Sequence, residues 1–118
     1  MPADPLPVDP LLSYARRDGD AIRVVLSLPT ATFKRRQVWV RFQGDEGGVR
    51  ALAEVTDRDG RLQAEVSVPR SDLPDGLWRL KLRAGPNAPL RSLRTKLLVS
   101  DSQPIALLPK FGSDAVGT

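Results

Sequence analysis

The chain contains neither cysteine nor histidine among its 118 residues. The absence of cysteine excludes disulfides, thiolate metal sites and cysteine nucleophiles. The absence of histidine removes the commonest general base near neutral pH, the usual Ser-His-Asp arrangement and most zinc and copper sites. We therefore expect no cofactor, no metal and no enzymatic activity of this chain alone, with Ser/Lys or paired-carboxylate catalysis still formally open.

Long apolar runs are also missing. No stretch approaches the roughly 20 apolar residues that span a bilayer. The start, MPADPLPVDP, lacks the basic segment followed by an apolar run that is typical of a signal peptide. We therefore expect no membrane insertion and, for a complete chain, a cytoplasmic location. The sequence is equally compatible with a piece of a larger protein.

The chain contains many charged residues and many turn-forming residues. Lys and Arg number 18 against 14 Asp and Glu, which gives a formal net charge of +4 and weakly favours acidic partners. The 11 prolines and 9 glycines fall between apolar runs, as turn residues do.

Apolar and polar residues alternate with period two along most of the chain, which is the pattern of half-buried strands. Turn signals separate the alternating runs, and Asp59-Gly60 is the strongest hairpin signal among them. About seven short strands without a helix of ordinary length predict an all-β fold, a sandwich or small barrel. A single immunoglobulin-like or fibronectin-III-like antiparallel β-sandwich fits this best. The expected strands are 21–28, 36–42, 49–55, 61–68, 77–83, 92–99 and 104–109.

Three segments follow from this pattern. We expect a Pro-rich extended lead-in at 1–18, the β-sandwich domain at 19–109 and a flexible tail at 110–118. Within the lead-in, PLLSYARRDGD offers at most one or two helical turns. The predicted core residues are Ile22, Val24, Leu26, Val38, Val40, Val66, Trp78, Leu80, Leu82, Leu97 and Val99.

The segments LPDGLWRLKLR (73–83) and LRTKLLVSDSQPIALLP (93–109) resemble the closing strands of small sandwich domains appended to bacterial glycosyl- and glycerophosphotransferases. A strand of the form DG-x-W-x-L-x-L-R recurs in those domains. The resemblance covers about a third of the chain. It implies a non-catalytic accessory module, and it carries over no catalytic residue.

Basic residues alternate with apolar ones on both sides of the break AGPNAP (84–89). If the two strands pair, their cations line one surface of the hairpin with hardly an acid among them. A second basic run, FKRRQ (33–37), adds Lys34, Arg35 and Arg36. The predicted basic binding face consists of Arg79, Lys81, Arg83, Arg91, Arg94 and Lys96.

Such a face suits an acidic protein surface or an anionic polymer, and a transferase or biosynthetic enzyme is one candidate partner. Nucleic acid is not favoured, because Trp78 is expected on the apolar side and not among the cations. Trp39, which lies opposite Val38 and Val40, is the candidate exposed aromatic. The same cations also have a purely structural explanation, since like charges discourage edge-to-edge pairing of sheets.

The leading hypothesis is therefore an interaction module that binds through its basic hairpin face. The alternative is a small-ligand-binding protein with a cavity between its sheets, which Ala51, Ala53 and Ala64 leave room for. Glu54 and Glu65 are expected to face each other across the hairpin closed by Asp59-Gly60. Solvent exposure of that pair is a simpler interpretation than catalysis.

Overall fold

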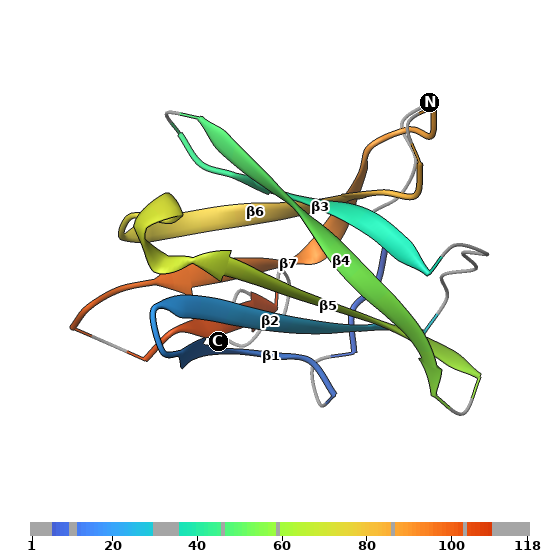
Figure 1. Cartoon of the computed structure of the whole chain (residues 1–118), viewed down its shortest axis with the longest axis horizontal. Helices are drawn as coiled ribbons and strands as arrows, with labels where there is room; N and C mark the ends of the chain where they lie inside the picture. Colours follow the sequence, from blue (N-terminus) through green and yellow to red (C-terminus); the bar gives the residue numbers. More distant parts are fainter. Residues whose placement is uncertain are drawn as a thin grey trace.

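The computed structural model describes residues 6–9, 12–29, 36–45, 47–58, 60–85, 87–102 and 104–109 (Figure 1). These residues form eight strands and one short 3-10 helix, and no helix among them is long and apolar enough to cross a membrane. The expected tail at 110–118 and the cations Lys34 and Arg35 lie outside the described residues. The elements are β1 (Tyr14–Asp18), β2 (Ala21–Leu28), β3 (Gln37–Gln43), β4 (Gly48–Arg58), β5 (Arg61–Pro69), η1 (Arg70–Asp72), β6 (Gly76–Arg83), β7 (Arg91–Val99) and β8 (Ala106–Pro109).

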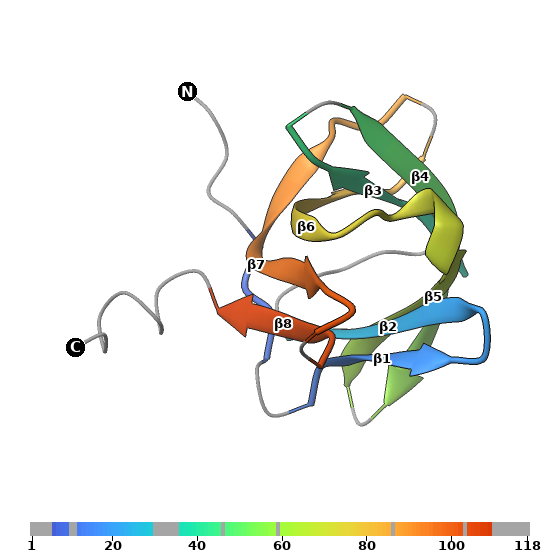
Figure 2. The ribbon, with the colours of Figure 1, turned by 90° about the vertical axis from the view of Figure 1, so that its left-hand side faces the viewer.

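All eight strands belong to one antiparallel sheet in the order β1-β2-β5-β4-β3-β6-β7-β8. The sheet curls until its edge strands β1 and β8 lie side by side, as Figure 2 shows. The predicted all-β class is confirmed. A sandwich of about seven strands is not confirmed, because one continuous ladder of eight strands encloses the core in a nearly barrel-like form.

The additional strand is β1, which lies inside the segment expected to be a lead-in. It pairs with β2 through a two-residue turn, in which Gly19 has φ 62°. An extended lead-in, with at most one or two helical turns, was the expectation for this segment, and the backbone bonds available along the edge of β2 explain why it is a strand instead. The signal that predicts it is Asp18-Gly19, a tight-hairpin dipeptide.

Two strands change partner along their length, which lets the sheet bend. The first part of β4 pairs with β3, and its last part, from Glu54 on, pairs with β5. In β7 the register to β6 shifts between Arg79 and Lys81. Near this shift the backbone of Leu6 also bonds to β7: its N–H donates to Ser92 O at 2.8 Å, and its carbonyl accepts from Arg94 N at 2.9 Å. Such irregularities increase local twist and allow closure.

The core fills the interior of the curled sheet. Ten of the eleven predicted core residues are buried; Trp78 is only partly buried and packs against the edge of the core. Its indole N–H donates to Pro74 O at 3.1 Å, so the ring remains near the surface beside the chain that precedes β6. The buried residues Leu6 and Leu73 lie outside the alternating runs and were not predicted.

Ion pairs join β1, the β5–β6 connection and the β7–β8 connection at one end of the sheet. The Arg70 guanidinium, next to β5, contacts Asp75 and Asp101, and Arg17 of β1 contacts Asp101 at 3.1 Å. Hydrogen bonds from Arg17 and then Arg70 hold the pKa of the Asp101 carboxyl below its ordinary value. Reciprocally, Asp101 and then Asp75 raise the pKa of Arg70. The network links β1 to the segments before β6 and after β7.

Candidate functional site

Strand β6 presents three of the predicted cations on the outside of the sheet. Leu80 and Leu82 are buried at 1% exposure, so the alternation turns Arg79, Lys81 and Arg83 outward. The predicted common face of these three side chains is confirmed.

Two of the three remaining predicted cations do not share this face. Lys96 lies opposite Arg79, but Arg91 lies opposite the buried Leu82 and is half-buried. Arg94 lies within the register shift, between the paired residues Ser92 and Lys96, and its N–H donates to Leu6 O. The hairpin surface expected from simple pairing across 84–89 is therefore divided by the register shift in β7.

Strand β3 lies on the other side of β6 and adds the residues that complete the surface. The pairing sets Trp39 opposite Arg83 and Arg41 opposite Lys81. On its far side, β3 pairs with β4, which places Arg50 opposite Arg41. We define the cationic face as the outward basic side chains that share this side of the three strands with Trp39: Arg41, Arg50, Arg79, Lys81 and Arg83.

Arg41 and Arg50 were not among the predicted site residues. The alternation places each on the polar side of its strand, and the hairpin through 44–47 brings the two together. The pairing of β3 with β6, which joins them to Arg83, connects strands distant in sequence and leaves no local signal.

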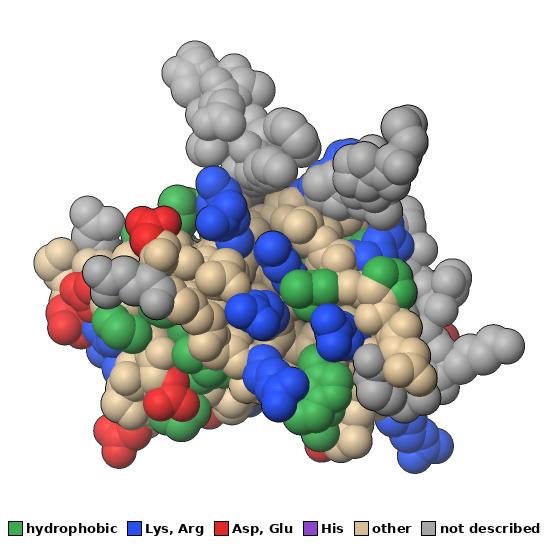
Figure 3. Space-filling model, turned by 90° about the horizontal axis from the view of Figure 1, so that it is seen from above, with side chains coloured by type: hydrophobic (Ala, Val, Ile, Leu, Met, Phe, Trp, Pro, Cys, Tyr) green, Lys and Arg blue, Asp and Glu red, His purple; other side chains and the backbone are tan. Residues whose placement is uncertain are grey.

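None of the five members of the cationic face is in an ion pair among the described residues. By contrast, Arg17, Arg23, Arg61 and Arg70, elsewhere on the surface, all contact a carboxylate. In Figure 3 the blue side chains gather around hydrophobic ones in the middle of the view, and red side chains lie toward its edges. The face therefore concentrates positive charge that no carboxylate in the described part of the chain pairs with.

A hollow of about 410 Å³ lies within this face. Its lining residues are Trp39, Arg41, Arg50, Arg83 and Leu90. Trp39 is 38% exposed, as predicted for the outward aromatic, and the Arg50 guanidinium lies 5.4 Å from the centre of its ring. The Arg83 Nε is buried without a hydrogen-bond partner in the described part of the chain. A buried donor of this kind favours an acceptor supplied from outside.

An acidic region adjoins the cationic face at the end where β6 begins. A second hollow, of about 540 Å³, lies there between the β3–β4 turn and the chain leading into β6. Asp45, Asp72 and Asp75 line it together with Leu77 and Trp78. Asp75 is paired with Arg70, whereas Asp45 and Asp72 form no ion pair with any described residue. We call these five residues the acidic end.

The carboxylates Glu54 and Glu65 face each other across β4 and β5, as predicted. Glu65 forms an ion pair with Arg23 of β2, which offsets the repulsion between the two carboxylates. No group of three or more acidic side chains in the described ranges is placed to hold a metal ion.

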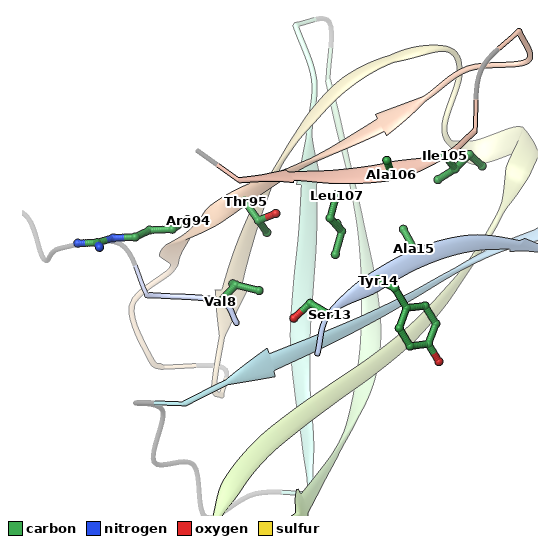
Figure 4. Close-up of a pocket in the computed structure, with 9 residues that line it drawn as sticks. All are labelled: Val8, Ser13, Tyr14, Ala15, Arg94, Thr95, Ile105, Ala106 and Leu107. Carbon is green, nitrogen blue, oxygen red and sulfur yellow. The ribbon is translucent and has the colours of Figure 1, made fainter. Parts of the chain in front are cut away.

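A cavity of about 280 Å³ lies where the edge strands meet (Figure 4). Val8, Ala15 and Leu107 contribute apolar walls, while Arg94 extends away from the other lining side chains. Two of its polar groups are already engaged: Ser13 Oγ accepts from Ser27 N at 2.8 Å, and Thr95 Oγ1 donates to Leu108 O at 3.3 Å.

Comparison with known proteins adds no identification. No protein-family model, no curated protein and no solved structure matches this chain.

Proposed function

We propose that the protein is a non-catalytic interaction module that binds an acidic protein surface or an anionic polymer through the cationic face. One observation carries the proposal: five basic side chains on three adjacent strands share one face with an exposed tryptophan, and no described carboxylate pairs with any of them. Like charges at this spacing repel one another in the free protein. An anionic partner relieves that repulsion and also supplies acceptors for the guanidinium groups.

The composition of the face supports recognition of a partner. Four of its five cations are arginine, whose planar guanidinium binds carboxylates and phosphates with two parallel hydrogen bonds. Tryptophan and arginine are also the residues most often found at energetic centres of protein interfaces. An evenly charged surface that serves only to prevent sheet pairing has no need for an outward tryptophan beside Leu52 and Leu90.

The experiment compares two double charge reversals with equal changes in net charge. Arg79→Glu with Arg83→Glu reverses the cationic face, and Arg16→Glu with Arg36→Glu reverses exposed cations outside it. Binding of fluorescein-labelled poly-glutamate and of inorganic polyphosphate is measured by anisotropy and calorimetry. We expect the first variant to lose about tenfold or more in affinity and the second to bind nearly as well as the parent protein.

Salt dependence tests the same proposal. The affinity of the parent protein must fall steeply as ionic strength rises, because the contacts are exposed and screened. Equal loss of binding in the two variants would mean that net charge alone attracts the probes. Absence of binding to both probes at low salt would overturn the proposal.

The larger context rests on the resemblance of residues 73–83 and 93–109 to accessory domains of bacterial transferases. On that basis we propose that the module delivers or anchors a biosynthetic enzyme to an acidic partner. A reading frame for a transferase fused or adjacent to this one would support this role.

The cavity between β1 and β8 gives the small-ligand alternative its one specific support. Its apolar walls suit a small hydrophobic ligand, but its volume of about 280 Å³ lies at the lower limit of ordinary ligand pockets. Because its serine and threonine are bonded within the chain, few polar groups remain to orient a ligand.

A further inference from the structure

We infer that the acidic partner surface of the cationic face is the acidic end of a second copy of this chain, in a two-fold symmetric dimer. The inference rests on the proposed function, because it requires the cationic face to bind acidic protein surface. It adds the identity of the partner, because the chain itself contains an acidic surface of the required kind.

The two charged regions lie on one continuous surface. Leu77 of the acidic end precedes Arg79, Lys81 and Arg83 on the outward side of β6. Gln43, next to the β3–β4 turn, lies opposite Arg79. Seen from above in Figure 3, acidic side chains lie toward the left-hand end, where Figure 1 shows the β3–β4 turn and the start of β6, and the basic group lies in the middle.

This adjacency makes the surface self-complementary. In a two-fold dimer the same surface of both copies is used, so that each contact between two regions occurs twice. Laying β6 of one copy antiparallel to β6 of the other brings each acidic end to the partner's cationic face. The span from Leu77 to Arg83 is about 20 Å at the rise of an extended strand, which is sufficient to keep the two contacts separate.

Exposed apolar side chains lie where such a contact requires them. Four of the six large hydrophobic residues exposed in the described chain belong to this surface: Trp39, Leu52, Leu77 and Leu90. Leu77 is the most exposed of these four, at 46%, and it is the one at the acidic end. In the dimer it meets the hollow between Trp39 and Leu90 of the other copy, with charged side chains around the contact. Apolar contacts within a charged rim are typical of protein interfaces.

The balance of charges limits the strength of the dimer. Each chain carries a net charge of +4, and five cations face only three carboxylates, one of which is already paired. Association is therefore reversible and sensitive to salt, and it is favoured at low ionic strength and high protein concentration.

Sedimentation equilibrium of the full chain over a series of concentrations tests the inference. At low salt we expect the apparent mass to rise from 12.9 kDa toward twice that value, and to return toward the monomer in high salt. Arg79→Glu with Arg83→Glu should remain monomeric at every concentration, and so should Asp45→Arg with Asp72→Arg. Arg16→Glu with Arg36→Glu is the control and should dimerise as the parent protein does. Circular dichroism confirms that each variant is folded.

Mixing the two monomeric variants is the decisive step. The first has a reversed cationic face and the second a reversed acidic end, so both contacts of the dimer become attractive again in a one-to-one mixture. Restoration of the dimer mass supports the inference. No restoration in the mixture, or dimerisation of either variant alone, overturns it.

Different experimental results would overturn the proposed function and the proposed dimer. A parent protein that stays monomeric but binds poly-glutamate would overturn the dimer and leave the proposed function in place. A protein that neither dimerises nor binds either anionic probe would overturn both. If the dimer forms, poly-glutamate must dissociate it, because both use the cationic face.

Discussion

Leu77 and Leu80 stand on the same strand, β6, but differ in their surroundings. Leu80 is 1% exposed within the core, and Leu77 is 46% exposed on the outer side. Leu80→Ala removes buried methyl groups and leaves a cavity, so we expect it to lower the free energy of unfolding by about 2–5 kcal/mol. Leu77→Ala is the matched control and should change it by less than about 0.5 kcal/mol. Urea denaturation of dilute protein measures both, and equal losses would contradict the assigned burial.

Side-chain alternation predicted the inward and outward positions of β6 well, since period two is a local property of any strand. It could not predict how deeply each inward residue is buried. Trp78 has the correct parity for the core, yet it lies at the end of the strand beside Pro74 and is only partly covered. Alternation also identified Trp39 as an outward residue. It could not show which arginines lie beside Trp39, because those of β4 and β6 are brought there by the pairing of different strands.

At the scale of single elements, the β4–β5 hairpin depends on the conformation of one glycine. Gly60 has φ 81°, a left-handed conformation that side chains with a Cβ rarely adopt, and its N–H donates to Asp57 Oδ1 at 3.0 Å. No atom would contact an added Cβ within 4 Å, so strain of the backbone is the whole cost of substitution. We expect Gly60→Ala to destabilise the protein by about 1 kcal/mol.

Asparagine tolerates this conformation better than alanine, so Gly60→Asn should retain most of the lost stability. Thermal denaturation of the three proteins provides the comparison. If alanine and asparagine lowered the melting temperature equally, the left-handed conformation would not be the cause.

Seven of the eight strands were predicted near their actual bounds, because turn chemistry and alternation coincide there. Strand β1 was missed because the prolines before it suggested a lead-in, although Asp18-Gly19 marks its hairpin. The register shift in β7 has no local sequence signal. Near the shift, Leu6, more than 80 residues away in sequence, forms backbone hydrogen bonds with Ser92 and Arg94. That shift is what divided the predicted set of cations.

At the scale of the whole molecule, the sequence indicated strands but not their partners. The pairings of β2 with β5 and of β3 with β6 connect distant segments, and these pairings make the sheet continuous. Sandwich and barrel-like arrangements use the same alternation, since both bury one side of every strand. The difference between them lies in these long-range ladders.

The ends of the continuous sheet are held by charge as well as by packing. Asp101 accepts hydrogen bonds from Arg17 of β1 and from Arg70 after β5, and both lower the pKa of its carboxyl. A carboxyl whose pKa is lower in the folded than in the unfolded state binds protons more weakly when folded. It therefore stabilises the fold at pH values above its ordinary pKa of 3.8, and this contribution is lost as the pH falls through the lower pKa of the folded state.

Asp101→Asn keeps the size of the side chain and removes the charge that both arginines contact. We expect a lower melting temperature than that of the parent protein at pH 7, and a difference that shrinks as the pH falls below about 4, where the parent carboxyl is protonated as well. Asp18, the exposed last residue of β1, forms no ion pair with any described residue, and Asp18→Asn is the matched control. Melting temperatures of the three proteins between pH 2 and 7 measure the effect. A constant difference at all pH values would show that the geometry of the side chain, and not its charge, joins β1 to the segment after β7.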